Sequence, residues 1–206
     1  MEMNRGWKAD ELAMLDAILG LLPERHTTFN EAIAEIVRGE YLSHGGKSYL
    51  SALGIYRPSA RSATLFTPAF GGNLELGSLV VPTFDFTLLT LVGHSLFNHP
   101  TIMERWPRLF RPGVDRHEAI AAKLQLLERE RIHEEICVEK KALRLDAKLP
   151  LERAFALAYT SYIVAPRRLF DAYTSAYHFL KESVFAGKEY RGEEPLFRSS
   201  GRPISV

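Results

Sequence analysis

Polar and apolar positions along the chain predict amphipathic helices interrupted by one segment of short strands. Apolar residues recur at helical spacing over residues 9–22, and Pro23 ends that pattern. Thr28, with Glu31 three residues later, resembles a capping box. It predicts a second helix whose buried stripe is formed by Phe29, Ile33, Ile36 and Val37.

Residues 41–84 are rich in Gly, Ser and Pro and contain short β-prone runs. These runs predict a small irregular sheet. Apolar periodicity then predicts a buried helix over residues 83–98 and a long charged helix over residues 115–148, with a kink near residues 128–131. Two closing helices are expected over residues 151–164 and 166–185. Pro166 stands at the favoured first turn of the last helix. We therefore expect an α+β, predominantly helical fold in one domain over residues 1–186, followed by a flexible tail over 187–206.

The expected helix over residues 83–98 carries a polar stripe on an otherwise apolar surface. At helical spacing, one face collects Thr83, Thr87, Thr90, His94 and Asn98. Convergent polar groups in apolar surroundings are typical of binding sites, so the stripe predicts a polar cleft. The alternative is a core helix in which the Thr hydroxyls bond their own helix carbonyls and His94 is a satisfied buried residue.

Composition and charge argue against nucleic-acid binding and against a membrane-spanning protein. The 206 residues carry a net charge of +1 without a basic tract, so we expect no nucleic-acid partner. No apolar run approaches the roughly 20 residues that span a bilayer, so we expect no membrane span. The only cysteine is Cys137, and the first residues lack a basic start followed by an apolar run. We expect a cytoplasmic protein, or one exported without a signal peptide.

Several short motifs follow one another in an order that resembles a known family. They are Leu22-Pro23-Glu24-Arg25-His26, Gly45-Gly46-Lys47-Ser48-Tyr49, a short sheet, the helix with His94, the pair Phe155-Ala156, and finally Pro166, Leu169, Tyr177, Phe179 and Leu180. Together they resemble the zincin metallopeptidases, and among these the anthrax lethal-factor-like group. The resemblance covers residues 9–185 and implies zincin-like helices packed on a small irregular sheet.

The chain departs from that family at the metal site. Zincins carry His-Glu-x-x-His on one helix, so that two imidazoles bind zinc and the Glu activates its water. The same register here reads His94-Ser95-Leu96-Phe97-Asn98. The third ligand of the group, a Glu two residues before Phe-Ala, corresponds to Arg153. Glu152 lies next to it and would serve only if the register shifts by one residue, which turns a side chain by about 100°.

The resemblance therefore implies a pseudo-metallopeptidase without a cofactor, more in keeping with a binding protein than with an enzyme. We expect it to bind a peptide or protein partner in the former substrate cleft, lined by Thr87, Thr90, His94, Ser95, Asn98 and Arg153. Arg153 is expected to substitute for zinc by donating to Asn98, His94 or Ser95.

Two other interpretations stay open. One is an active metal-dependent peptidase or hydrolase with zinc held by non-standard ligands, drawn from His94, His99, His133 and Glu152. The other is a helical structural or interaction protein. His133 and Cys137 have the four-residue spacing that allows chelation from one helix, but no second pair of ligands is evident, and a solvated, charge-rich helix with a partly buried Cys is the favoured explanation.

Overall fold

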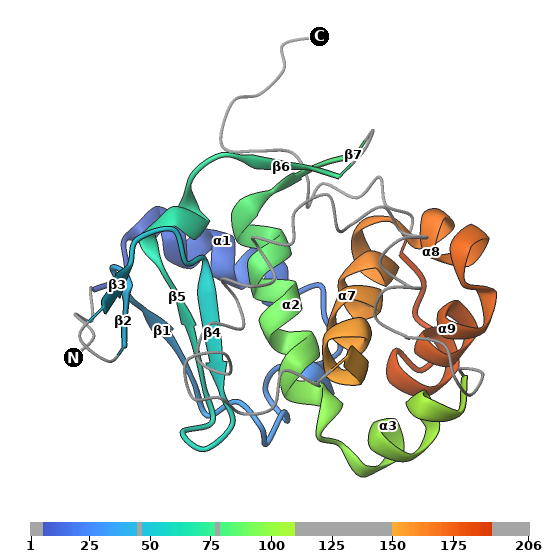
Figure 1. The fold of residues 1–206 in the computed structure, drawn as a ribbon. Helices are drawn as coiled ribbons and strands as arrows, with labels where there is room; N and C mark the ends of the chain where they lie inside the picture. The colour runs from blue at the N-terminus through green and yellow to red at the C-terminus, as the bar shows by residue number, and fades with distance from the viewer. Residues whose placement is uncertain (1–5, 45–46, 77–78, 110–149, 191–206) are drawn as a thin grey trace, which may run out of the picture.

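The computed structural model describes residues 6–44, 47–76, 79–109 and 150–190. Of the confidently placed residues, 55% are helical and 16% lie in strands, so the fold is α+β and predominantly helical, as the sequence predicts. Figure 1 shows the central sheet and one hairpin on one side of the molecule, helix α2 (Thr83–Phe97) in the centre with a second hairpin above it, and the C-terminal helices on the other side.

The central sheet has three strands in the order β1 (Glu35–Arg38), β5 (Ser62–Leu65) and β4 (Gly54–Arg57). β1 runs parallel to β5, whereas β4 runs antiparallel to it. β1 and β4 therefore each have one edge that pairs with no other strand in the described part of the chain. Two separate hairpins pair β2 (Leu42–His44) with β3 (Lys47–Tyr49), and β6 (Asn73–Leu76) with β7 (Leu79–Pro82).

Two helices, α1 (Ala9–Leu19) and α2 (Thr83–Phe97), pack on the same face of this sheet. Arg38, Leu65 and Gly54 are neighbours across the three strands, so they share that face. Arg38 reaches Glu11 of α1, and a Cβ atom at Gly54 would lie 3.1 Å from Thr87 Cγ2 of α2. On the other face, a smaller core is formed by Leu42, Ala52, Ile55 and Phe66 with Tyr49 against it.

α2 is buried along its whole length because α7 (Pro150–Val164) packs on it beside the sheet (Figure 1). Beyond α7 lie α3 (Pro100–Arg105), α8 (Pro166–Ala172), α9 (Thr174–Phe179) and a π turn (Leu180–Val184). Short 3₁₀ turns occur at Glu24–His26, Thr67–Phe70 and Trp106–Leu109. Large aromatic side chains fill this half of the core: Trp106, Phe155, Tyr159, Tyr162 and Phe185.

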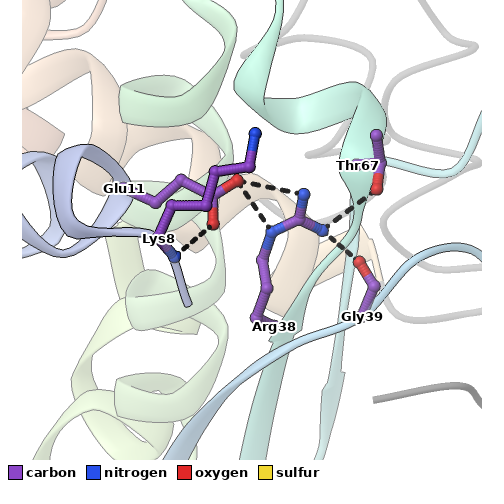
Figure 2. Close-up of polar contacts among 5 residues, drawn as sticks. All are labelled: Lys8, Glu11, Arg38, Gly39 and Thr67. Carbon is purple, nitrogen blue, oxygen red and sulfur yellow. Dashed lines mark hydrogen bonds and ion pairs between the residues drawn. The ribbon is translucent and has the colours of Figure 1, made fainter. Parts of the chain in front are cut away.

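A buried ion pair fastens α1 to the sheet (Figure 2). Arg38 Nη2 lies 3.1 Å from Glu11 Oε1, and the two side chains are 2% and 6% exposed. Arg38 also donates to the carbonyl of Gly39 and to the hydroxyl of Thr67. Burial acts to raise the pKa of Glu11, but hydrogen bonds from Arg38 and from the backbone N–H of Lys8 lower it overall. The pair is therefore held as ions in the interior.

The prediction of a helix that begins at Thr28 is wrong. The chain makes turns there and then forms β1. Asn30 Oδ1 accepts from the backbone N–H of Ala32 at 3.0 Å, a local bond that competes with helix formation. The β-branched residues Ile36 and Val37 pair with β5 instead. Phe29, placed in the buried stripe by periodicity, is 67% exposed.

The other expected helices that fall within the described residues match their expected positions with two differences. α1 ends at Leu19, short of the expected boundary at Leu22. The last expected helix begins at Pro166 as predicted but is divided at Tyr173, whose φ of −153° and ψ of 72° are not helical. The break accompanies the packing of Tyr177 on Tyr162, with ring centroids 5.2 Å apart.

Several expectations lie outside the described residues. They include the charged helix over residues 115–148, the ligand candidate His133 with Cys137, and most of the tail. Among the helices that the structure describes, none is long and apolar enough to cross a membrane.

Candidate functional site

The centre of the candidate site is a buried pair formed by His94 of α2 and Glu152 of α7. His94 Nδ1 lies 2.9 Å from Glu152 Oε1, and the side chains are 5% and 6% exposed. The two helices come close because Gly93 faces Ala156. A Cβ atom at Gly93 would lie only 2.9 Å from Ala156 Cα, so the absence of a side chain permits this contact.

The threonines of the polar stripe are satisfied within the core. Thr87 donates to the carbonyl of Thr83 at 2.7 Å, and Thr90 donates to the carbonyl of Phe86 at 2.8 Å. The Thr90 and Thr160 hydroxyls lie 3.1 Å apart across the α2–α7 interface. Thr87 and Thr90 are fully buried. Both threonines therefore have the arrangement that the sequence offered as the alternative to a cleft, in which buried hydroxyls bond the carbonyls of their own helix.

Ser95 and Asn98 lie at the end of α2 in different surroundings. Ser95 is buried, donates to the carbonyl of Val92 at 2.7 Å and accepts from Asn30 Nδ2 at 2.9 Å. Asn98 caps the C-terminus of α2 and is exposed. The Ser95 hydroxyl is thus engaged in structural hydrogen bonds.

Tyr56 of β4 joins this group and was not found from the sequence. Its hydroxyl donates to the carbonyl of Ala32 at 3.0 Å. Burial and the negative charge of Glu152 raise the pKa of Tyr56, whereas hydrogen bonding with Asn98 acts to lower it. His94, Asn98, Glu152 and Tyr56 therefore gather where α2, α7 and β4 meet, and we call them the His94 cluster. The β-prone run at residues 49–56 was the signal for the strand, but not for this contact.

The structure places Glu152, and not Arg153, against His94. Neighbouring residues on a helix point about 100° apart, so only one of them can face α2 directly. Arg153 is half-buried beside this pair. The contact with His94 is thus made by the carboxylate of Glu152, the neighbour of the position that the sequence favoured. Substitution of zinc by the Arg153 guanidinium stays a prediction.

The His94 cluster does not fit a catalytic zinc ion. Such sites use about three strong protein donors and an open position, and this cluster offers one imidazole and one carboxylate, with the amide of Asn98 as a poor third donor. His99 is exposed at the start of α3. In the described ranges, no group of three or more His, Cys, Asp or Glu residues is arranged to hold a metal.

A second polar cluster joins the segment after α1 to the C-terminal half. His26 is 2% exposed. Its Nε2 lies 2.8 Å from the carbonyl of Val184, and its Nδ1 lies 3.0 Å from the hydroxyl of Tyr159. Because a carbonyl only accepts, Nε2 carries the proton and Nδ1 accepts from Tyr159. Burial lowers the pKa of His26 from 6.5 to about 4, so this imidazole is neutral and structural.

Comparisons with protein-family models, curated protein sequences and solved structures gave no match to this chain.

Proposed function

We propose that the chain is a zincin-like domain without a catalytic metal, which binds an extended peptide beside the His94 cluster. The observation that carries the proposal is the 2.9 Å contact between His94 and Glu152. If the register shifts by one residue from Arg153 to Glu152, these two positions correspond to the first and third zinc ligands of a zincin. Here they bond to each other inside a helix interface, and the second ligand position is occupied by Asn98.

The outer edge of β4 supports the choice of a peptide as ligand. The Phe66 N–H donates to the Leu53 carbonyl at 2.9 Å, which fixes the alternation of hydrogen bonds between β4 and β5. Ile55 consequently turns its backbone toward β5, while the N–H and C=O groups of Gly54 and Tyr56 point to the outer edge. A peptide added there as a strand would lie next to the Tyr56 side chain and the His94 cluster.

Peptide hydrolysis is not expected from this group of residues. The buried Ser95 hydroxyl cannot replace a Glu as general base, because it is committed to Val92 and Asn30. His94 and Glu152 hold one another in place. A buried pair held in this way suits a packing role beside a bound peptide rather than activation of water.

Metal binding by a restored site tests the scaffold. Zinc per chain is measured by elemental analysis after purification without tag or chelator, for the natural sequence and for Asn98→His. We expect no stoichiometric zinc in the natural chain and about one zinc per chain in Asn98→His, since His94, the new imidazole and Glu152 complete three ligands. Asn98→Gln is the matched control, because it changes the same exposed position without adding a strong donor.

Either of two results would overturn this part of the proposal. Stoichiometric zinc in the natural chain would favour the active metallohydrolase instead. A folded Asn98→His protein that binds no more zinc than Asn98→Gln would show that the cluster lacks zincin geometry.

Peptide binding is tested separately, by amide hydrogen exchange with a ligand selected from a random peptide library. We expect the ligand to slow exchange at Tyr56, whose N–H faces the outer edge. Ile55 serves as the internal control because its N–H already pairs with β5. Selected ligands that protect other regions and leave Tyr56 unchanged would refute binding at this edge.

A further inference from the structure

A hollow of about 570 Å³ lies at the edge of the sheet opposite to β4, between the end of α1, the start of β1 and the middle of α2. Its volume is in the range of sites that hold small ligands or peptide side chains. No residue of the His94 cluster lines it. The hollow is therefore a separate site, and a ligand bound there is independent of the function proposed for the His94 cluster.

The hollow runs along the unpaired edge of β1. The Gly39 N–H donates to the Leu65 carbonyl at 2.9 Å, so alternation directs the backbone of Val37 toward β5 and that of Ile36 away from it. The Ile36 N–H and C=O therefore face the edge of β1 that pairs with no other strand in the described part of the chain. Glu35 and Ile36 point to opposite faces of the sheet, yet both line the hollow, which places it at the strand edge.

The lining of the hollow is acidic at its rim and apolar at its floor. Three exposed carboxylates, those of Asp16, Glu24 and Glu35, contribute to it, and no Lys or Arg does. The apolar part comes from Leu19, Leu22, Ile33, Ile36 and Val92. Long cationic side chains match this pattern, because their methylene stems cover apolar surface while the charged head stays at the rim.

We propose that the edge of β1 binds an extended peptide rich in Lys or Arg. The peptide adds as a fourth strand and exchanges backbone hydrogen bonds with Ile36. Its cationic side chains lie among Asp16, Glu24 and Glu35. The backbone bonds supply affinity for an extended chain of any sequence, and the carboxylates select against acidic chains.

A fluorescein-labelled heptapeptide of alternating Lys and Val tests the charge requirement by fluorescence anisotropy with the full chain. We expect the double variant Asp16→Lys, Glu35→Lys to bind at least about tenfold more weakly than the natural sequence. Asp171→Lys combined with Glu182→Lys is the matched control, because it makes the same change of charge at two exposed acids outside the hollow, and it should change binding less than about twofold. Thermal unfolding confirms that the variants are folded.

Amide exchange tests the strand addition itself. The Lys-Val peptide should slow exchange at Ile36, while Val37, already directed toward β5, should change little. A Glu-Val peptide of the same length should not bind. Equal affinity of the double variant and the natural chain would overturn the proposal, because it would show that Asp16 and Glu35 do not select the peptide. Binding without protection of Ile36 would also overturn it, because it would show that the peptide does not add to β1. Protection at Tyr56 in place of Ile36 would assign the peptide to the β4 edge.

Discussion

Replacement of Asp85 by Asn should stabilise the protein at alkaline pH and not at acidic pH. Asp85 lies in the first turn of α2 and is 4% exposed. Its Oδ2 atom has no hydrogen-bond partner among the described residues. Burial without compensating hydrogen bonds raises the pKa of this carboxyl from 3.8 to about 7. The folded protein therefore carries a cost for ionising a group that ionises freely in the unfolded chain.

The size of the effect follows from linkage between protonation and folding. One pKa unit corresponds to about 1.4 kcal/mol, so the rise from 3.8 to about 7 sets an upper bound of about 4 kcal/mol. Between these two pH values the folded state retains a proton that the unfolded state has released. Stability is therefore lost as the pH rises through this window. The helix N-terminus favours the carboxylate by about 0.3–1 kcal/mol, and a buried Asn amide also needs an acceptor.

We accordingly expect Asp85→Asn to gain about 2 kcal/mol at pH 8, or about 4–8 °C in Tm, and nothing at pH 4. Urea unfolding at both pH values measures the difference. Asp10→Asn is the control, because Asp10 is an exposed aspartate in the first turn of α1. A variant that is destabilised more at pH 8 than at pH 4 would refute the reasoning, since it would show that the Asp85 carboxylate has favourable partners in the folded state.

Three further substitutions test the packing around the two sites. His26→Ala should lower the free energy of unfolding by about 2–4 kcal/mol at pH 7, because it leaves the Tyr159 hydroxyl and the Val184 carbonyl unpaired. In the natural chain, His26 stays neutral in the folded state while it is protonated in the unfolded state, so stability falls as the pH drops from 6.5 to about 4. Urea unfolding should show that this pH dependence is absent from the variant. Gly93→Ala should lower Tm despite better helix propensity, because its Cβ would meet the backbone of Ala156 at 2.9 Å, whereas Gly71→Ala, with nothing within 4 Å, should be neutral. Arg38→Met should cost about 3–5 kcal/mol in urea unfolding by leaving the Glu11 carboxylate buried alone, and adding Glu11→Gln should recover much of that loss.

The sequence predicted the central helix well but not the role of its polar face. Fifteen consecutive residues of α2 are buried, so the helix has no solvent side against which a polar stripe could be oriented. On a helix that is buried on all sides, a row of threonines is as compatible with contact with another helix as with the lining of a cleft. The Thr90–Thr160 contact and the carbonyl bonds of Thr87 and Thr90 are the outcome. Periodicity identified the threonine face of α2, but its role depends on the packing of α7 against it.

β1 shows a different limit of sequence analysis. Its apolar residues Ile36 and Val37, with Ile33 just before them, fit a helical stripe as well as a strand of four residues. The strand exists because residues 62–65, far along the chain, offer a parallel partner. Short strands depend on such distant pairing for their stability, which a local pattern does not contain. Tyr56 was not predicted as a site residue for the same reason, because its contact with the His94 cluster depends on where β4 lies relative to α2 and α7.

The choice between Glu152 and Arg153 follows from the contact between α2 and α7. The two helices approach closely at Gly93 and Ala156. Residues four positions before and after Ala156 share its face, and these are Glu152 and Thr160. Both meet α2, Glu152 at His94 and Thr160 at Thr90. A spacing of small and polar residues on α7 therefore sets the register, and it directs a carboxylate rather than a guanidinium at the imidazole. Asn98→His is consequently the informative substitution, because an imidazole at that position would give the His94 cluster three donors.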